Sequence, residues 1–154
     1  MSAVGCGSVA AGWHFAGGIV YWTFGTSCGI PSIQTPENFG SEFARWDFSI
    51  KKSGTYQIAV KIPPSAAACG LTVDKYTTGA KYYLINGANK QSTILNQKAS
   101  IGQEVVLFAN SHLDPGTMNI YLYDSVTDLN NCCASCNQSI RVFLDYAKVT
   151  WVGP

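Results

Sequence analysis

Three cysteines lie within five positions of the segment NNCCASCNQ, residues 130–138. Cys133 and Cys136 have the spacing of a thioredoxin-type redox pair, but such a pair needs a strand before it and a helix after it, because this setting lowers the thiol pKa. The flanking sequences LNN and NQS predict neither element. A zinc site would need a second closely spaced pair of cysteines or histidines, and the sequence has none. We therefore predict structural disulfides, with no metal ion and no other cofactor.

The pairing of the six cysteines is only partly specified by the sequence, because six cysteines allow many connectivities. Adjacent Cys132 and Cys133 are not expected to bond to each other, since the peptide between them strains the disulfide geometry. One of the two is expected to reach Cys69, and the other to close a small ring with Cys136. An amino-terminal bridge is the best single pairing for the remaining two, Cys6 and Cys28.

Composition indicates an exported protein. Charged residues make up 12% of the 154 residues and the formal net charge is +1, so the sequence offers no basic surface for nucleic acid. An even number of cysteines in a chain rich in Gly, Ser, Thr, Asn and Tyr is typical of an oxidising, extracellular environment. Residues 1–15 lack the charged start and the long apolar run of a signal peptide or membrane span. We expect a signal that has been removed, or a chain that belongs to a larger secreted protein.

Residues 110–114, NSHLD, place a serine, a histidine and an aspartate within one short segment. Neighbours on a single turn rarely reach the mutual geometry of a Ser-His-Asp triad, and the chain has no GxSxG motif. We interpret the segment as a polar hairpin loop in which Asp114 starts the turn. The acidic residues show no signature of a glycosidase carboxylate pair, and Asp145, within a predicted strand, is expected to bind loop backbone. The chain is predicted not to be an enzyme, with a small hydrolase as the lesser alternative.

Aromatic and polar side chains favour sugar binding. Pyranose rings have apolar C–H faces that stack on Trp and Tyr, and hydroxyls that pair with Asn, Gln, Asp and Arg. The chain has 4 Trp and 8 Tyr. Trp46, Tyr56 and Tyr82 occupy inward positions of predicted strands, so we assign them to the core. The ligand-binding candidates are aromatic residues that lie in predicted loops, or at strand positions that alternate with the inward-facing ones: Trp13, Tyr21, Trp22, Tyr76, Tyr83 and Tyr123.

Two aspartates, Asp124 and Asp128, are candidates for a Ca²⁺ site of the kind found in related sugar-binding sandwiches. Calcium prefers carboxylate and carbonyl oxygens, which these residues and their backbone would supply. The DSVTD spacing does not by itself specify such a site, so the prediction includes no metal.

The elements that must position these residues are β-strands almost throughout. Residues 55–62, TYQIAVKI, alternate strictly and place four apolar side chains on one face before two prolines end the strand. Residues 42–50, EFARWDFSI, alternate as well, and the turn KKSGT joins the two strands into a hairpin. No segment sustains an apolar period of 3.6 over three helical turns. Further strands are predicted at residues 80–85, 92–96, 104–109, 118–125 and 139–151, with turns such as NGAN and DPGT between most of them.

Many short strands without helices for parallel crossovers predict an all-β fold, an antiparallel β-sandwich of jelly-roll type. Residues 1–154 are expected to form a single domain, with residues 1–17 as a loosely structured amino-terminal segment. The long loops at residues 23–41, 63–79 and 125–139 contain most of the cysteines. The predicted disulfides therefore staple loops, where binding sites usually lie.

Several short motifs, in order, resemble the golvesin/Xly carbohydrate-binding-like domain family of secreted proteins. The segment RWDFSIKKSGTYQIAVKIP resembles the family's opening, Asn96-Gln97 resembles its "DQ", and LDYAKV resembles its closing "ADAV" strand with Asp145 in the acidic position. Further matches are Tyr82, Leu84, Leu107 and the DPGT turn. Glu104 departs from the pattern, since the family usually has a Trp there. The similarity covers residues 43–149 and implies a non-catalytic β-sandwich module that accompanies polysaccharide- or cell-wall-active proteins.

A self-assembling extracellular structural or adhesive subunit is the alternative function. Low charge together with abundant Tyr, Asn and Thr suits surfaces that bury one another as well as it suits sugar. The predicted partner is thus a polysaccharide or cell-surface glycan, or else further copies of the same chain.

Overall fold

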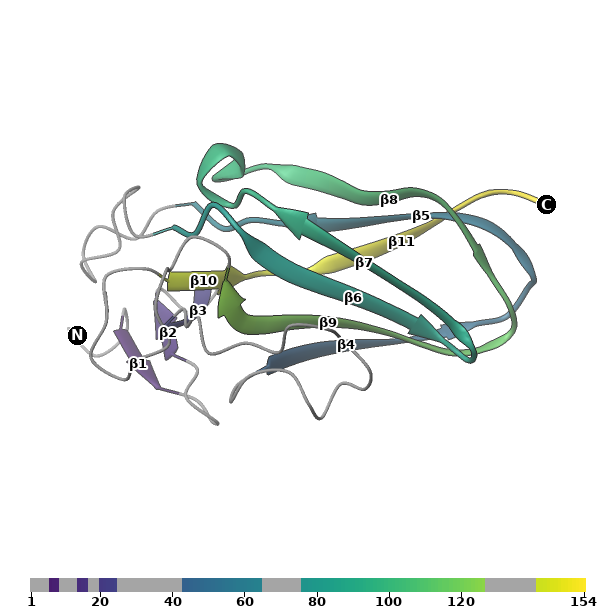
Figure 1. Cartoon of the computed structure of the whole chain (residues 1–154), viewed down its shortest axis with the longest axis horizontal. Helices are drawn as coiled ribbons and strands as arrows, with labels where there is room; N and C mark the ends of the chain where they lie inside the picture. The colour runs from purple at the N-terminus through teal and green to yellow at the C-terminus, as the bar shows by residue number, and fades with distance from the viewer. Residues whose placement is uncertain (1–5, 9–13, 17–19, 25–42, 65–75, 127–140) are drawn as a thin grey trace.

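The computed structural model describes residues 6–8, 14–16, 20–24, 43–64, 76–126 and 141–154 (Figure 1). Within these described residues the regular structure is β apart from one short 3-10 helix, η5 (Lys98–Ser100). The strands are β1 (Cys6–Ser8), β2 (His14–Ala16), β3 (Val20–Phe24), β4 (Phe43–Ile50), β5 (Gly54–Lys61), β6 (Ala80–Asn86), β7 (Asn89–Leu95), β8 (Glu104–Leu113), β9 (Gly116–Val126), β10 (Arg141–Leu144) and β11 (Ala147–Gly153). The predicted all-β fold is confirmed.

Two antiparallel sheets form a sandwich-like core structure. One sheet has the strand order β11-β5-β8 and the other β4-β9-β6-β7. Figure 1 shows the two sheets lying over one another, with a small sheet of order β1-β2-β3-β10 at one end. All pairings in the three sheets are antiparallel.

The core between the sheets follows from the period of two. In β5 the side chains of Tyr56, Ile58 and Val60 are buried, as the alternation predicts. β9 contributes the alternate residues Met118, Ile120 and Leu122, which are fully buried and belong to the same cluster. Burial of each such aliphatic side chain contributes roughly 1.5–3 kcal/mol to folding.

The three aromatic residues assigned to the core differ in how far they are buried. Tyr56 and Tyr82 are buried as predicted. Trp46 is half-buried and packs against the cluster from β4, which lies at the end of its sheet's strand order. An edge position leaves one flank of a large side chain uncovered, so burial of Trp46 is partial.

Gln97 ties the connection between β7 and β8 to β10. Its Nε2 donates hydrogen bonds to the Tyr82 hydroxyl at 2.9 Å and to the Phe143 carbonyl at 2.8 Å. Its Oε1 accepts a hydrogen bond from the Phe143 amide at 2.9 Å. The side chain is fully buried, so these three contacts satisfy a polar group that would otherwise be costly to bury.

Three predicted details change in the structure. The expected strand at residues 139–151 is two strands, because β10 pairs with β3 and β11 pairs with β5 in a different sheet. Asp145 therefore lies between strands, and among the described residues no hydrogen bond ties it to loop backbone. The expected loop at residues 110–114 is also wrong in part: Asn110, Ser111 and His112 belong to β8, and only Asp114 starts the turn.

Other predictions fall outside the described residues. Residues 6–8 and 14–16 of the amino-terminal segment form β1 and β2, but the side chain of Cys6 is not described. The remaining cysteines also lie outside the described residues: Cys28, Cys69, Cys132, Cys133 and Cys136. The predicted disulfides remain predictions.

Candidate functional site

Three tight turns meet at one end of the sandwich, the end where the chain also terminates (Figure 1). They join β4 to β5, β6 to β7 and β8 to β9. Gly87 (φ 60°) begins the two-residue turn between β6 and β7, and Gly116 (φ 131°) ends the turn between β8 and β9. Positive φ angles favour glycine, so these two residues permit the reversals that bring polar side chains together here.

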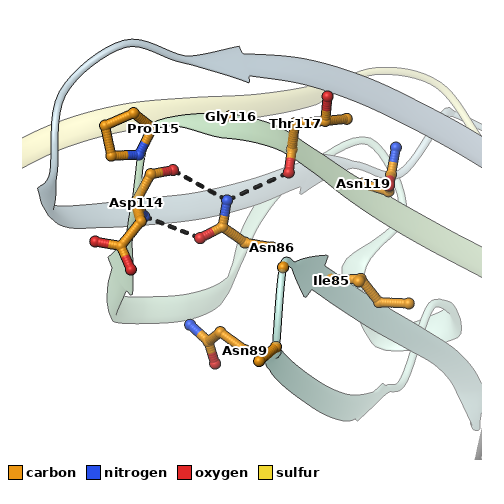
Figure 2. A pocket seen from close by; sticks show the side chains of 10 residues that line it. Ile85, Asn86, Asn89, Asp114, Pro115, Gly116, Thr117 and Asn119 are labelled. Carbon is orange, nitrogen blue, oxygen red and sulfur yellow. Dashed lines mark hydrogen bonds between the residues drawn. The ribbon is translucent and has the colours of Figure 1, made fainter.

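An open hollow of about 770 Å³ lies between two of these turns (Figure 2). One wall is the β6–β7 turn with Asn86 and Asn89, and the other is the β8–β9 turn with Asp114 and Thr117. Side-chain amides, a carboxylate and a hydroxyl thus face a shared space. Such groups donate and accept the hydrogen bonds that a polyhydroxylated ligand requires.

Asn86 fixes the distance between the two walls. Its Nδ2 donates to the carbonyl oxygens of Asp114 (3.1 Å) and Thr117 (3.3 Å), and its Oδ1 accepts from the Asp114 amide at 2.9 Å. Figure 2 shows this side chain pointing into the β8–β9 turn. The side chain is 7% exposed, so Asn86 has a structural role beside the hollow.

A second hollow continues the first along the outer face of the β4-β9-β6-β7 sheet, because Thr117 and Asn119 line both. Asp47 Oδ1 lies 2.8 Å from Arg45 Nε and accepts a hydrogen bond from Asn119 Nδ2. Arg45 also bonds the side chain of Tyr121, and this contact, ahead of the Asp47 charge, raises the pKa of Arg45. Arg45 and Asp47 are about half exposed. A guanidinium, a carboxylate and an amide are therefore held in a row and face solvent.

Three tyrosines extend this outer face beyond Arg45. The rings of Tyr83 and Tyr123 meet edge to face with centroids 5.3 Å apart, and Tyr121 and Tyr123 are parallel at 5.8 Å. Tyr83 is half-buried, and partial burial raises its hydroxyl pKa. Tyr123 is 1% exposed, so its ring packs against its neighbours and presents no open face for stacking.

Of the six predicted ligand-binding residues, the structure describes the side chains of three, Tyr76, Tyr83 and Tyr123. Tyr76 is buried in the core and stacks on Phe143 with centroids 3.7 Å apart, and burial raises its pKa to about 12. Tyr76 therefore has a packing role in this structure. Tyr83 and Tyr123 share the outer face described above. The positions of the remaining three are not described beyond the backbone of β3 for Tyr21 and Trp22, and Trp13 lies outside the described residues.

The calcium candidates are also untested. Asp124 lies in β9, but its side chain is not described, and Asp128 lies outside the described residues. Among the residues that the structure describes, no three His, Cys, Asp or Glu side chains gather as a metal site would require.

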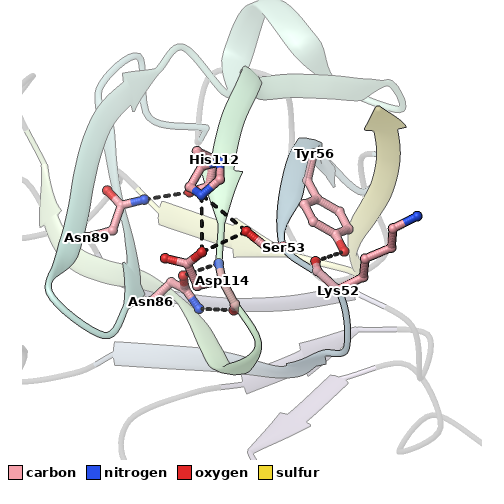
Figure 3. Close-up of polar contacts among 7 residues, drawn as sticks. All are labelled: Lys52, Ser53, Tyr56, Asn86, Asn89, His112 and Asp114. Atoms are coloured by element: carbon pink, nitrogen blue, oxygen red, sulfur yellow. Dashed lines mark hydrogen bonds and ion pairs between the residues drawn. The ribbon is translucent and has the colours of Figure 1, made fainter. Parts of the chain in front are cut away.

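Ser53, His112 and Asp114 do meet in space, although the serine is not the one in the NSHLD segment (Figure 3). Ser53 Oγ donates to Asp114 Oδ1 at 2.8 Å, and His112 Nε2 lies 3.1 Å from the same oxygen and 3.4 Å from Ser53 Oγ. In a catalytic triad the serine and the aspartate bind opposite nitrogens of the imidazole. Here both approach Nε2, and the Ser53 proton is committed to the carboxylate.

The cluster is therefore a surface contact that joins two turns. His112 and Asp114 are exposed, and the bond from Ser53, followed by the contact with His112, lowers the pKa of Asp114. Ser111 lies on the other side of β8, where its hydroxyl donates to Gln91 Oε1 at 3.0 Å. Ser53 is 59 residues from His112 in the chain, so no local motif signals this contact.

Sequence reasoning also missed Arg45, Asn119 and Trp151. Arg45 alternates with partly buried residues of β4 and Asn119 with buried residues of β9, so the period of two places both on the outer face. Their proximity across the strands follows only from the pairing of β4 with β9. Trp151 lies within the predicted strand at residues 139–151, and the residue is 38% exposed.

Comparison with known proteins assigns no family. The chain matches no family model and no curated protein. In the described part of the chain, no helix has the length and apolar character needed to cross a bilayer.

Proposed function

We propose that this protein is a non-catalytic glycan-binding module, as the resemblance to golvesin/Xly domains implies. The observation that carries the proposal is the continuous polar surface from Asn89 and Asp114 to the row of Asp47, Asn119 and Arg45. Its planar side chains present fixed donors and acceptors to a ligand rich in hydroxyls.

The rigidity of this surface supports recognition rather than catalysis. Arg45, Asp47 and Asn119 lie on paired strands, where Asp47 is directly opposite Asn119. Groups held on strands lose little freedom when a ligand binds, which lowers the cost of binding. The Ser53 cluster lacks triad geometry, so it supplies no activated nucleophile.

The proposal includes the finer features of the predicted fold and setting. The module is secreted, its sandwich has jelly-roll topology, and disulfides staple its loops. It is attached to, or accompanies, a polysaccharide- or cell-wall-active protein. Mass spectrometry with and without reductant tests the disulfides, since each bridge lowers the mass by about two hydrogens relative to the reduced chain.

Retention on insoluble polysaccharides tests the binding function. Asp47→Asn removes the charge that holds Arg45, and Asn119→Ala removes the amide beside it. We expect each change to weaken binding by about 1–3 kcal/mol, the cost of breaking a charge-assisted hydrogen bond or leaving its partner unsatisfied.

Glu104→Gln is the matched control, because Glu104 is also a carboxylate with two side-chain partners, Tyr146 and Lys148, but on the other sheet. Its affinity should equal that of the wild type. Equal loss in all three variants, or no retention of the wild-type protein on a broad polysaccharide panel, would overturn the proposal.

A self-assembling subunit is the second candidate, and exposed apolar side chains favour it. Ile94, Val106 and Val152 are each about half exposed. In the described part of the chain, β4 and β11 each have one neighbouring strand, and such edges can pair with another copy. Sedimentation velocity over a range of concentrations distinguishes this function, since an assembling subunit forms larger species as its concentration rises.

A further inference from the structure

Trp151 presents an exposed aromatic ring at the turn-bearing end of the sandwich. Of the two tryptophans whose side chains are described, Trp46 packs against the core, whereas Trp151 lies near the end of β11 with 38% exposure. Gly54 lies directly against the six-membered ring of Trp151, where a Cβ atom would collide with it. The Tyr56 ring meets the indole edge to face, with centroids 5.2 Å apart and an interplanar angle of 80°. The indole is thus supported by Gly54 and Tyr56 and is partly exposed to solvent.

A cation lies over this ring. Lys52 Nζ is 4.5 Å from the centroid of a Trp151 ring, within the range of a cation–π interaction. The Tyr56 hydroxyl donates to the Lys52 carbonyl at 2.7 Å, which anchors the turn that carries the lysine. Lys51, its neighbour, is also exposed. An apolar aromatic surface and positive charge therefore occupy one site.

This site lies beside the hollow described above. Lys52 precedes Ser53, whose hydroxyl bonds the Asp114 carboxylate at 2.8 Å, and Asp114 lines the hollow. Figure 3 shows Lys52 and Tyr56 on one side of Ser53, with His112, Asp114 and the two asparagines on the other. The turn between β4 and β5 therefore contacts both the Trp151 ring, through Lys52, and a residue that lines the hollow, through Ser53.

We propose that Trp151 and Lys52 bind an acidic sugar unit, a uronate, of a polysaccharide chain that also occupies the hollow. The exposed Lys52 side chain moves aside from the ring, the C–H face of the sugar stacks on the indole, and the sugar carboxylate pairs with the displaced Lys52 ammonium. A ligand with both an apolar face and a negative charge satisfies both groups, whereas a neutral sugar engages the ring alone. The inference rests on the proposed glycan-binding function and names its substrate class.

Titration with polygalacturonate tests the site, with its methyl-esterified form as the uncharged probe on the same backbone. We expect the wild-type protein to bind the acid form more tightly, with an affinity that falls as salt rises. Trp151→Ala should weaken binding of both probes by about tenfold or more, a loss comparable to removal of other stacking platforms. Lys52→Gln should weaken binding of the acid form by several-fold and leave the methyl ester unaffected.

Lys98→Gln is the matched control, since it removes the same charge from an exposed lysine in η5, at the other end of the sandwich (Figure 1). Lys52→Gln removes an exposed side chain, so it keeps the test valid even if Trp151→Ala does not fold. Equal losses in the Lys52 and Lys98 variants would overturn the inference, because only net charge would then matter. Unchanged affinity in Trp151→Ala would overturn the stacking.

The two proposals fail separately. Suppose the wild-type protein binds only the methyl ester, and that Asn119→Ala loses this binding while Trp151→Ala keeps it. This result would refute the acidic site and leave the glycan-binding function standing. Binding to neither probe nor any other polysaccharide would refute both. A third result would identify a membrane surface as the ligand in place of a sugar: the wild-type protein binds vesicles of anionic phospholipid but no glycan, and Trp151→Ala loses the vesicle binding.

Discussion

Replacing Asn86 with aspartate tests whether one side chain holds the two walls of the hollow together. Asn86 Nδ2 donates to the carbonyls of Asp114 and Thr117, and Oδ1 accepts from the Asp114 amide. The change keeps the shape of the side chain but replaces both N–H donors by an oxygen. In the ionised variant that oxygen faces two carbonyl oxygens, while the bond from the Asp114 amide remains.

The magnitude follows from these contacts. Two lost hydrogen bonds cost about 0.5–1.5 kcal/mol each, and two carbonyls that lose this donor and face a charge beside a 7% exposed residue add a similar amount. We expect Asn86→Asp to lower the free energy of unfolding by about 3–5 kcal/mol at pH 7. Asn89→Asp is the control. Asn89 is half-buried and its Nδ2 donates only to the His112 carbonyl among the described residues, so its replacement should cost about 1 kcal/mol.

The penalty should depend on pH with a definite sign. The site disfavours the charged form, so the pKa of the introduced carboxyl is raised in the folded protein above its unfolded value. The folded state then holds the extra proton. The penalty is smallest below the unfolded pKa of about 4 and grows as pH rises through the raised folded pKa.

Urea denaturation of both variants and the wild type at pH 4 and pH 7 measures these differences. Each variant is compared with the wild type at the same pH, because the lowered pKa of Asp114 destabilises every form on acidification. An Asn86→Asp penalty below about 1 kcal/mol at pH 7 would refute the reasoning, since each lost bond alone is of that size. A penalty that does not shrink at pH 4 would show that charge is not its cause.

Three further predictions concern the fold around the site. Gln97→Met removes the hydrogen bonds that Gln97 makes to the buried Phe143 amide and carbonyl, so the free energy of unfolding measured in urea should fall by about 2–5 kcal/mol. An unchanged free energy of unfolding would contradict the role of Gln97 in holding β10. Gly54→Ala drives a Cβ into the Trp151 ring and to 2.8 Å from the Gly153 carbonyl. We expect the free energy of unfolding to fall by about 1–3 kcal/mol, with a shift in tryptophan fluorescence. Gly102→Ala is the control: its positive φ (76°) also strains an alanine, but no atom lies within 4 Å of the added Cβ, so it should lower stability without shifting the fluorescence. Burial raises the pKa of Tyr76 to about 12 and that of Tyr82 as well. Both hydroxyls stay protonated in the folded protein at a pH where they already ionise in the unfolded chain, whose tyrosine pKa is about 10. The free energy of unfolding should therefore fall as pH rises from about 10 to 12. Ultraviolet absorption that shows every tyrosine ionising near pH 10 would contradict this prediction.

The strands and much of the core were predictable because their signal is local. Alternation in residues 55–62 identified β5 and the buried positions of Tyr56, Ile58 and Val60 before any pairing was known. The DPGT and NGAN segments marked the turns in the same way, through residues that tolerate unusual backbone angles. These patterns depend on neighbours one or two residues apart, which the sequence displays directly.

The candidate site was much less predictable, because its contacts join distant segments. Asp47 and Asn119 are 72 residues apart and meet only because β4 pairs with β9. Ser53 meets Asp114 across 61 residues. Local alternation gives each strand an inner and an outer face but not the identity of its neighbour, so burial of Tyr123 on the outer face was also hidden.

The division of each strand into two faces explains how this chain could carry the proposed binding surface without weakening its core. In β4, Arg45 and Asp47 alternate with Trp46 and Phe48, which pack against the core. A change at Arg45 or Asp47 should therefore alter the proposed ligand surface and leave the apolar layer intact. The turns lack this separation, since Asn86 both lines the hollow and holds the β8–β9 turn. Variation in ligand preference should therefore be tolerated on the outer strand positions and be costly at Asn86.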